Sequence, residues 1–159
     1  MTCLTLVNAH LAFGHVPLLD GADFSLVEGE RVGLIGRNGT GKSSLLKILA
    51  GLEQPDDGMV QRQQGLVTAY VPQEPALDGH ATVFEAVQQG LAPVLDLIAQ
   101  YESGQGDLDA LQTQIEANDG WQWKQRVDAA LHKLGLDGQA RLSTLSGGNI
   151  KRVALAQAL

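Results

Sequence analysis

Residues 36–43 read Gly36-Arg37-Asn38-Gly39-Thr40-Gly41-Lys42-Ser43. They fit the pattern G-x-x-x-x-G-K-[ST] at every required position, which is typical of a loop that binds nucleotide phosphates. The glycines allow the backbone to turn and to bring its N–H groups close to phosphate oxygens. The lysine supplies a positive charge for the β- and γ-phosphates, and the hydroxyl of the following serine can bind Mg²⁺. The motif predicts a site for a nucleotide and Mg²⁺.

The segments on either side of the loop strengthen this prediction. The apolar run Arg31–Ile35 predicts a buried strand, and a predicted helix starts at Ser43 and ends near Ala50, before Gly51. A helix that begins at the loop directs its free N–H groups and its dipole at a bound anion. An ordinary glycine-rich turn would lack this strand–loop–helix context, so we interpret residues 36–43 as a nucleotide site.

The overall composition is that of a globular domain. The 159 residues are 44% apolar and 18% charged, with a formal net charge of −7. No basic stretch is present that could neutralise many phosphates, so the chain is a poor candidate for a stand-alone nucleic-acid binder. The single Cys3 excludes an internal disulfide and suits a reducing compartment. No basic-then-apolar leader and no apolar run of about 18 residues is present, so we expect a cytoplasmic chain without direct membrane insertion.

Local patterns predict strands in the first half and helices in the second. Short strands are expected at residues 2–7, 24–27 and 67–71, with a loop at 53–58. Thr82 and Glu85 form a capping-box signature, with Val83, Ala86 and Val87 on one helix face. Further helices are expected over Leu91–Tyr101 and over Trp123–Leu134. Between them, Leu108, Leu111 and Ile115 have the spacing of residues on one side of a third helix.

Two more motifs follow the phosphate loop. Gln73 lies in the run Val71-Pro72-Gln73-Glu74-Pro75, which alone reads as a polar loop at the end of a strand. The later run is Leu145-Ser146-Gly147-Gly148-Asn149. Its serine can cap the next helix, whose apolar face holds Val153, Leu155, Ala156 and Leu159, and its glycines allow close approach of the backbone to an anion. In isolation this run is an ordinary helix cap.

Together and in this order, the three motifs resemble an ABC-type ATPase domain, of which LSGG is the diagnostic signature. The resemblance extends over the whole chain. It implies an α/β P-loop NTPase core with an antiparallel β-subdomain and a helical subdomain, truncated after the signature motif. Residues 1–81 would hold the β-subdomain and phosphate-loop core, 82–140 the helical subdomain, and 141–159 the signature motif and its helix.

The resemblance also implies ATP and Mg²⁺ as ligands and assigns roles to individual residues. Lys42 and Gln73 would act in catalysis, Ser43 and Gln73 would lie at the metal, and Phe13 would stack on adenine, although it also reads as a core or edge phenylalanine. Nucleotide contacts would come from Gly36, Arg37, Asn38, Gly39, Thr40, Gly41, Lys42, Ser43 and Ser44. Ser146, Gly147 and Gly148 would contact the γ-phosphate of ATP held by a facing second ABC domain, either in the same full-length chain or in a homodimer.

Within the superfamily the chain looks most like the ABC-F group and its Uup-like members, as the N-terminal part of a first ABC domain. The residues that carry this finer match are Asn118–Trp121, Lys133–Leu136, Asn149 and residues 151–159. That group implies a full-length protein that hydrolyses ATP to drive a conformational cycle associated with the ribosome and translation. Two alternatives remain open, namely the ATP-binding subunit of a membrane transporter and an ABC ATPase that acts on DNA.

The family pattern continues past the signature into an apolar strand ending in Asp-Glu and then a switch histidine. These residues do not follow the signature between Gly148 and Leu159. Phosphoryl transfer to water needs the metal's acidic partner and a group that positions the water. We therefore expect the 159-residue chain to bind nucleotide without turnover.

Overall fold

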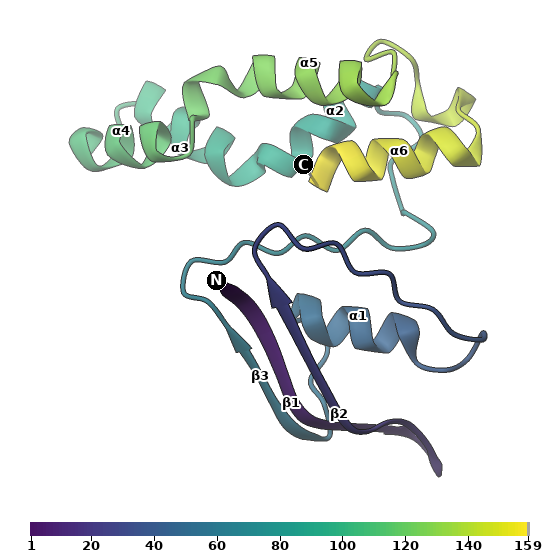
Figure 1. The fold of residues 1–159 in the computed structure, drawn as a ribbon. Helices are drawn as coiled ribbons and strands as arrows, with labels where there is room; N and C mark the ends of the chain where they lie inside the picture. Colours follow the sequence, from purple (N-terminus) through teal and green to yellow (C-terminus); the bar gives the residue numbers. More distant parts are fainter. Residues whose placement is uncertain (159) are drawn as a thin grey trace. The chain divides into compact units, whose positions relative to one another are not determined.

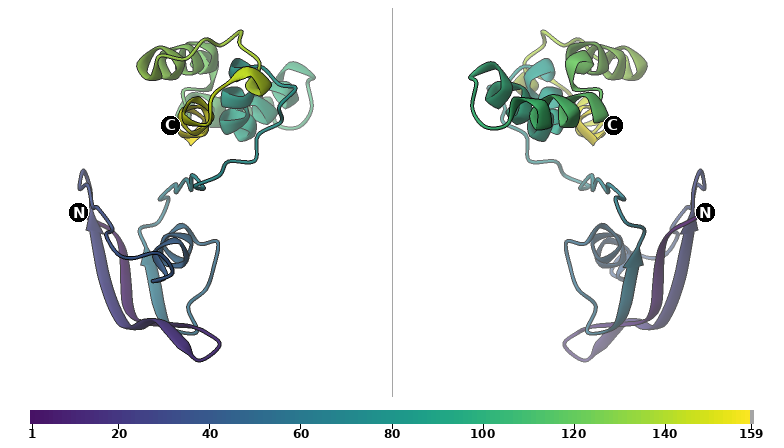
Figure 2. Two further views of the ribbon diagram at one scale, coloured as in Figure 1. Left: turned by 90° about the vertical axis from the view of Figure 1, so that its right-hand side faces the viewer. Right: turned by 90° about the vertical axis from the view of Figure 1, so that its left-hand side faces the viewer.

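The computed structural model describes residues 1–158, which form two compact units, Met1–Tyr70 and a second unit that begins at Val71. The first unit contains three strands and one helix (Figures 1 and 2). Its elements are β1 (Thr2–Phe13), β2 (Val16–Val27), α1 (Lys42–Ala50) and β3 (Asp57–Arg62). The second unit is built of helices joined by loops and short 3₁₀ turns. Its elements are α2 (Val83–Gln88), η1 (Gln89–Leu91), α3 (Ala92–Glu102), α4 (Leu108–Ala117), η2 (Gly120–Gln122), α5 (Trp123–Leu134), η3 (Leu142–Thr144) and α6 (Gly147–Ala158).

The sheet of the first unit is antiparallel, with the strand order β2-β1-β3. Helix α1 lies against one face of it, as the two views of Figure 2 show. Leu6 and Ala9 of β1 and Ile48 of α1 are fully buried between the two layers. This small apolar core fixes α1, and with it the end of the phosphate loop, against the sheet.

Strand β1 is irregular near its middle, where β3 approaches it closely. Asn8 has a φ of 47°, and its backbone N–H donates to Asp23 Oδ1 at 2.7 Å. Gly58 faces this point with a φ of 90°, and a Cβ at Gly58 would lie 2.6 Å from the Val7 carbonyl oxygen. Only glycine fits there without a shift of the backbone.

The two strands expected around the nucleotide-loop core are not formed. Residues 31–35 and 67–71 have no strand hydrogen bonding, so both expectations were wrong for this structure. A strand exists only through its partner, and the ladders among the described residues join β1 to β2 and β3 alone. The apolar side chains of these segments are exposed, with Ile35 at 95% and Val67 at 91%. Conversely, β3 was not predicted, and it begins inside the loop expected at 53–58. Its largely polar sequence shows no alternation of apolar and polar residues that would have indicated a strand.

The other two predicted strands are confirmed but are longer than expected. The segment at 2–7 continues to Phe13, and the segment at 24–27 begins already at Val16, across a turn at Gly14 and His15. Asp20 and Gly21 are residue types that favour turns, but they lie at a register shift within β2 and do not interrupt the strand.

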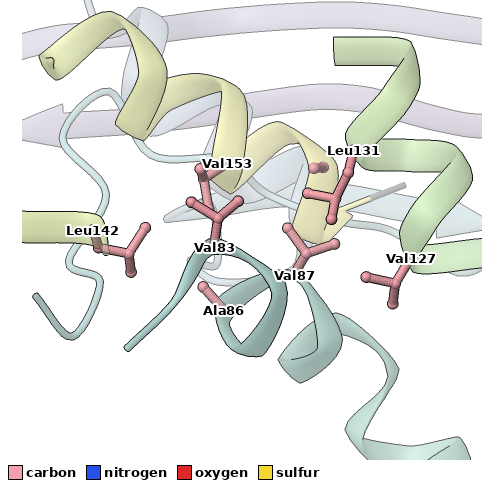
Figure 3. Close-up of a cluster of buried hydrophobic side chains, with 8 residues drawn as sticks. Val83, Ala86, Val87, Val127, Leu131, Leu142 and Val153 are labelled. Atoms are coloured by element: carbon pink, nitrogen blue, oxygen red, sulfur yellow. The ribbon is translucent and has the colours of Figure 1, made fainter. Parts of the chain in front are cut away.

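The helices of the second unit enclose one larger apolar cluster. Helix α2 lies at its centre, with Val83, Ala86 and Val87 buried as predicted from their shared face. They pack against α5 and α6, and Figure 3 shows Val83 beside Val153 of α6 and Val87 beside Leu131 of α5. The other buried members of the cluster are Val127, Leu131, Leu142, Val153 and Ala156.

A smaller cluster joins α3 and α4 through Val94, Ile98 and Ile115. Leu111 is buried with α4 as predicted, but Leu108 is 43% exposed, so its expected burial was wrong. It is the first residue of α4, where no neighbouring element covers it fully. Leu155 of α6 is also 43% exposed, contrary to its predicted place on the apolar face, and Leu159 lies outside the described residues.

Several predicted helix ends are confirmed by their caps. Thr82 and Glu85 form both hydrogen bonds of a capping box at α2. Gly51 and Gly135 end α1 and α5 in the left-handed conformation that glycine adopts without strain. Within residues 1–158, no helix combines the length and the apolar content needed to cross a membrane.

Candidate nucleotide-binding site

The phosphate loop connects the sheet to the first turn of α1. Helix α1 begins at Lys42, directly after Gly41, so its free N–H groups lie at the end of the loop. Gly39 and Gly41 have φ values of 82° and 83°. These left-handed conformations are the ones that the motif's glycines make accessible. The confirmed loop-to-helix junction is therefore the geometry in which backbone N–H groups and a helix dipole act on one anion.

The lysine of the motif is folded back over the loop that precedes it. Lys42 Nζ donates hydrogen bonds to the carbonyl oxygens of Gly36 at 2.8 Å and Arg37 at 2.7 Å. The hydroxyl of Thr40 donates to the same Arg37 carbonyl at 2.8 Å. The loop is thus held by its own side chains, and the Lys42 ammonium is bonded to two carbonyl oxygens of the loop.

Leu18 supports the loop from β2, a contact that sequence patterns did not reveal. A Cβ placed on Gly41 would lie 2.9 Å from the Cβ of Leu18, which is too close without a shift. The backbone of the loop therefore rests directly on the strand. The only available signal was the apolar pair Leu18-Leu19, which nothing in the sequence connects to residue 41.

The remaining predicted contacts of the first unit lie at or near α1. Ser43 and Ser44 occupy its first turn after Lys42, and the exposed Ser43 is free to offer a hydroxyl oxygen. Such an oxygen is a ligand type that suits Mg²⁺ together with substrate phosphates. Phe13, at the end of β1, is 81% exposed, so it is not a core residue. An exposed ring is available for stacking, and no aromatic partner of Phe13 occurs among the described residues.

Gln73 and the signature lie in the second unit. Gln73 is exposed in the segment that precedes α2. Ser146 Oγ accepts a hydrogen bond from the Asn149 N–H at 3.3 Å, so the predicted serine cap of α6 is confirmed. A Cβ on Gly147 would meet no atom within 4 Å, which leaves the backbone at the start of α6 open to close approach.

The fold and the loop together define a class of protein. The ABC transporter family matches residues 19–159, and the chain belongs to that family. A dimeric structure of an ATP-binding cassette in a post-hydrolysis state, bound to ADP and Pi, has a TM-score of 0.67 and 25% identity to this chain. It covers 98% of this chain, which in turn covers 68% of it. The predicted ABC ATPase fold is confirmed.

Curated relatives narrow the class. The chain is similar to the ATP-binding protein Uup of Haemophilus influenzae, with 37% identity, and the similarity covers 100% of this chain. It is also similar to the energy-dependent translational throttle protein EttA of the same species, with 34% identity over 89% of its residues. The predicted resemblance to Uup-like proteins is confirmed. The chain spans only 26% and 28% of the lengths of these two relatives.

Proposed function

We propose that this chain binds ATP with Mg²⁺ through the loop at residues 36–43, as part of an ABC-F protein. The observation that carries the proposal is the phosphate loop at the start of α1 in a chain that is 37% identical over its whole length to an ATP-binding protein. Lys42 would contact the β- and γ-phosphates, and Ser43 would supply one oxygen to the metal. The backbone of residues 36–44 would bind the triphosphate, and Phe13 would stack on the adenine.

Gln73 and the signature would complete the chemistry from two directions. Gln73 would bind at the metal and sense the γ-phosphate in its own domain. Ser146, Gly147 and Gly148 would contact ATP held by a facing ABC domain, since a serine-capped helix start with an open backbone is suited to an anion. Two such composite sites would make the functional unit a head-to-tail pair of cassettes.

The whole protein would use ATP hydrolysis to drive a cytoplasmic cycle at the ribosome. The similarity to a translational throttle protein supports this partner. A single 159-residue chain would bind nucleotide but not turn it over, because the signature contacts to its ATP would have to come from a facing ABC domain. Steady ATP hydrolysis by the purified chain that disappears in Lys42→Ala would contradict that last point.

Ribosome association is testable by co-sedimentation. A polypeptide of the relatives' full length that carries these residues should pellet with ribosomes when ATP is bound and its hydrolysis is blocked. The same polypeptide with Lys42→Ala should remain in the supernatant at ATP concentrations that fill only the unaltered first site, because its affinity for ATP there is reduced. If the unaltered polypeptide also remains there while nucleotide is bound, the partner is not the ribosome, and a transporter or DNA becomes the better candidate.

A further inference from the structure

Two segments that are far apart in the sequence are joined by hydrogen bonds in the second unit. One runs from Gly79 to Phe84, just after Gln73, and the other from Gly138 to Ser143, just before the signature. Their backbone bonds are Leu142 N–H to Ala81 O at 3.0 Å, Ser143 N–H to Gly79 O at 3.1 Å, Val83 N–H to Ala140 O at 2.9 Å and Phe84 N–H to Gly138 O at 3.0 Å. Thr82 and Arg141 form an isolated antiparallel bridge at the centre.

Arg141 is the residue at which this connection meets the signature turn. Its guanidinium donates from Nη1 to the His80 carbonyl oxygen at 3.1 Å. Its own carbonyl oxygen accepts from the Thr144 N–H at 3.0 Å and from the Thr144 hydroxyl at 2.7 Å. One residue therefore binds the segment after Gln73 through its side chain and the turn before Ser146 through its backbone.

The turn itself is anchored by burial. Leu142, the first residue of η3, is 3% exposed and packs in the central cluster with Val83 of α2. Leu145 N–H donates to Leu142 O at 3.1 Å, and Ser146 then caps α6. Hydrogen bonds of Arg141 and Leu142 thus connect the segment at Gly79–Thr82 with the turn before α6.

We propose that Arg141 is a positioning residue for the signature, which it fixes to the segment that follows Gln73. This inference rests on the proposed function, because Ser146 must act on a nucleotide for its position to matter. The hydrogen bonds of Arg141 go to His80 and Thr144. Its side chain contributes one charged hydrogen bond at a surface site, so its loss should change the position and order of the turn more than the global stability.

A purely structural role makes a different prediction. If Arg141 only stabilised the helical unit, its replacement would act like the loss of any comparable bond there. Arg126 provides that comparison, since its Nη1 donates to the Asn118 carbonyl oxygen at 2.9 Å in the same unit, at the connection between α4 and η2. Arg126→Ala removes the same chemistry at a place that does not lead into the signature.

The test measures ATP turnover in a polypeptide of the relatives' full length that carries these residues. Arg141→Ala should lower kcat about three- to tenfold and leave the KM for ATP within about twofold. Arg141→Lys, which keeps a donor for the His80 carbonyl, should recover most of the loss. Arg126→Ala should match the unaltered protein. An Arg141→Ala protein with unaltered kcat, or an Arg126→Ala protein with an equal loss, overturns the inference, while absence of turnover in the unaltered protein overturns the proposed function itself.

Hydrogen exchange on the 159-residue chain provides a second readout that does not depend on turnover. In Arg141→Ala the amides of Leu142, Ser143 and Thr144 should exchange about threefold faster or more, while those of α5 stay unchanged. Equal exchange at these amides in both proteins overturns the inference even if Arg141→Ala lowers kcat.

Discussion

Lys42 Nζ lies 2.7 Å from the carbonyl oxygen of Arg37, so the lysine of the phosphate loop is bonded to the loop itself. A second bond, to the Gly36 carbonyl, shares the same ammonium. In this state the charged group satisfies backbone acceptors, and phosphate oxygens would compete with those acceptors for it. The lysine therefore has a structural role in addition to its expected role toward the nucleotide.

Removal of Lys42 should therefore weaken the first unit even without nucleotide. Lys42→Ala is expected to lower the free energy of unfolding by about 0.5–1.5 kcal/mol, since two hydrogen bonds from a partly exposed ammonium are lost. Urea unfolding of the nucleotide-free chain measures this difference. An unchanged midpoint and slope would mean that the bonds to Gly36 and Arg37 contribute nothing to the loop.

The two left-handed glycines of the loop allow conformational strain to be separated from steric contact. Gly39→Ala should lower the free energy of unfolding by about 1 kcal/mol through the positive φ alone, because a Cβ there meets no atom within 4 Å. Gly41→Ala should cost more, because its Cβ would also press on Leu18 at 2.9 Å. Thermal unfolding of the two variants checks the order, and equal losses would show that Leu18 does not support the loop.

The close packing of η1 on α6 predicts a sharp penalty at Gly90. A Cβ at Gly90 would collide with the Gln157 carbonyl group, whose carbon would be only 2.9 Å away. Gly90→Ala should destabilise the second unit by about 1–3 kcal/mol. Gly79→Ala is the matched control, because its Cβ would lie at an ordinary 3.8 Å from Ser143 Cβ. Similar unfolding midpoints for the two variants would contradict the observed contact.

The contribution of the α2 capping box to the stability of the second unit should depend on pH. Hydrogen bonds from the Thr82 backbone and hydroxyl, with a smaller effect of the Arg141 charge, hold the pKa of Glu85 below its usual 4.5. Because the pKa is lowered in the folded state, the stabilisation is present above about pH 4.5 and is lost as the pH falls through the folded value. The free energy of unfolding of Glu85→Gln should therefore differ most from that of the unaltered chain at neutral pH, and the two values should converge in acid.

Urea unfolding at neutral pH and in acid checks this convergence. Thr82→Ala should cost about 0.5–2 kcal/mol at neutral pH, since it removes the cap itself. If the difference in unfolding free energy between Glu85→Gln and the unaltered chain stays constant into strong acid, the ionised Glu85 carboxylate does not stabilise the cap at Thr82.

Local chemistry explains which parts of the fold the sequence could predict. The capping box at Thr82, the glycine ends of α1 and α5, and the Ser146 cap depend on a few adjacent residues, and all of them formed as expected. The strand predicted at Arg31–Ile35 depended on a distant partner, and apolar composition alone cannot provide that partner.

In the candidate site, too, local features could be predicted from the sequence and long-range contacts could not. The phosphate loop and its helix follow from eight adjacent residues, but two long-range relationships gave no local signal. One is the support of Gly41 by Leu18. The other is the bond from Arg141 to His80, which joins residues 61 positions apart in the sequence. Such contacts follow from tertiary packing rather than from any periodic pattern.

ATP affinity, measured by titration of the 159-residue chain with ATP and Mg²⁺, tests the central claim most directly. The unaltered chain should bind with a Kd within about 1 μM to 1 mM, and Lys42→Ala should weaken binding at least about tenfold. Lys47→Ala, in the same helix but paired with Glu53 at 3.0 Å, should bind like the unaltered chain. Binding that is equally strong in all three proteins, or absent from the folded unaltered chain, would contradict the assignment of residues 36–43 as the nucleotide site.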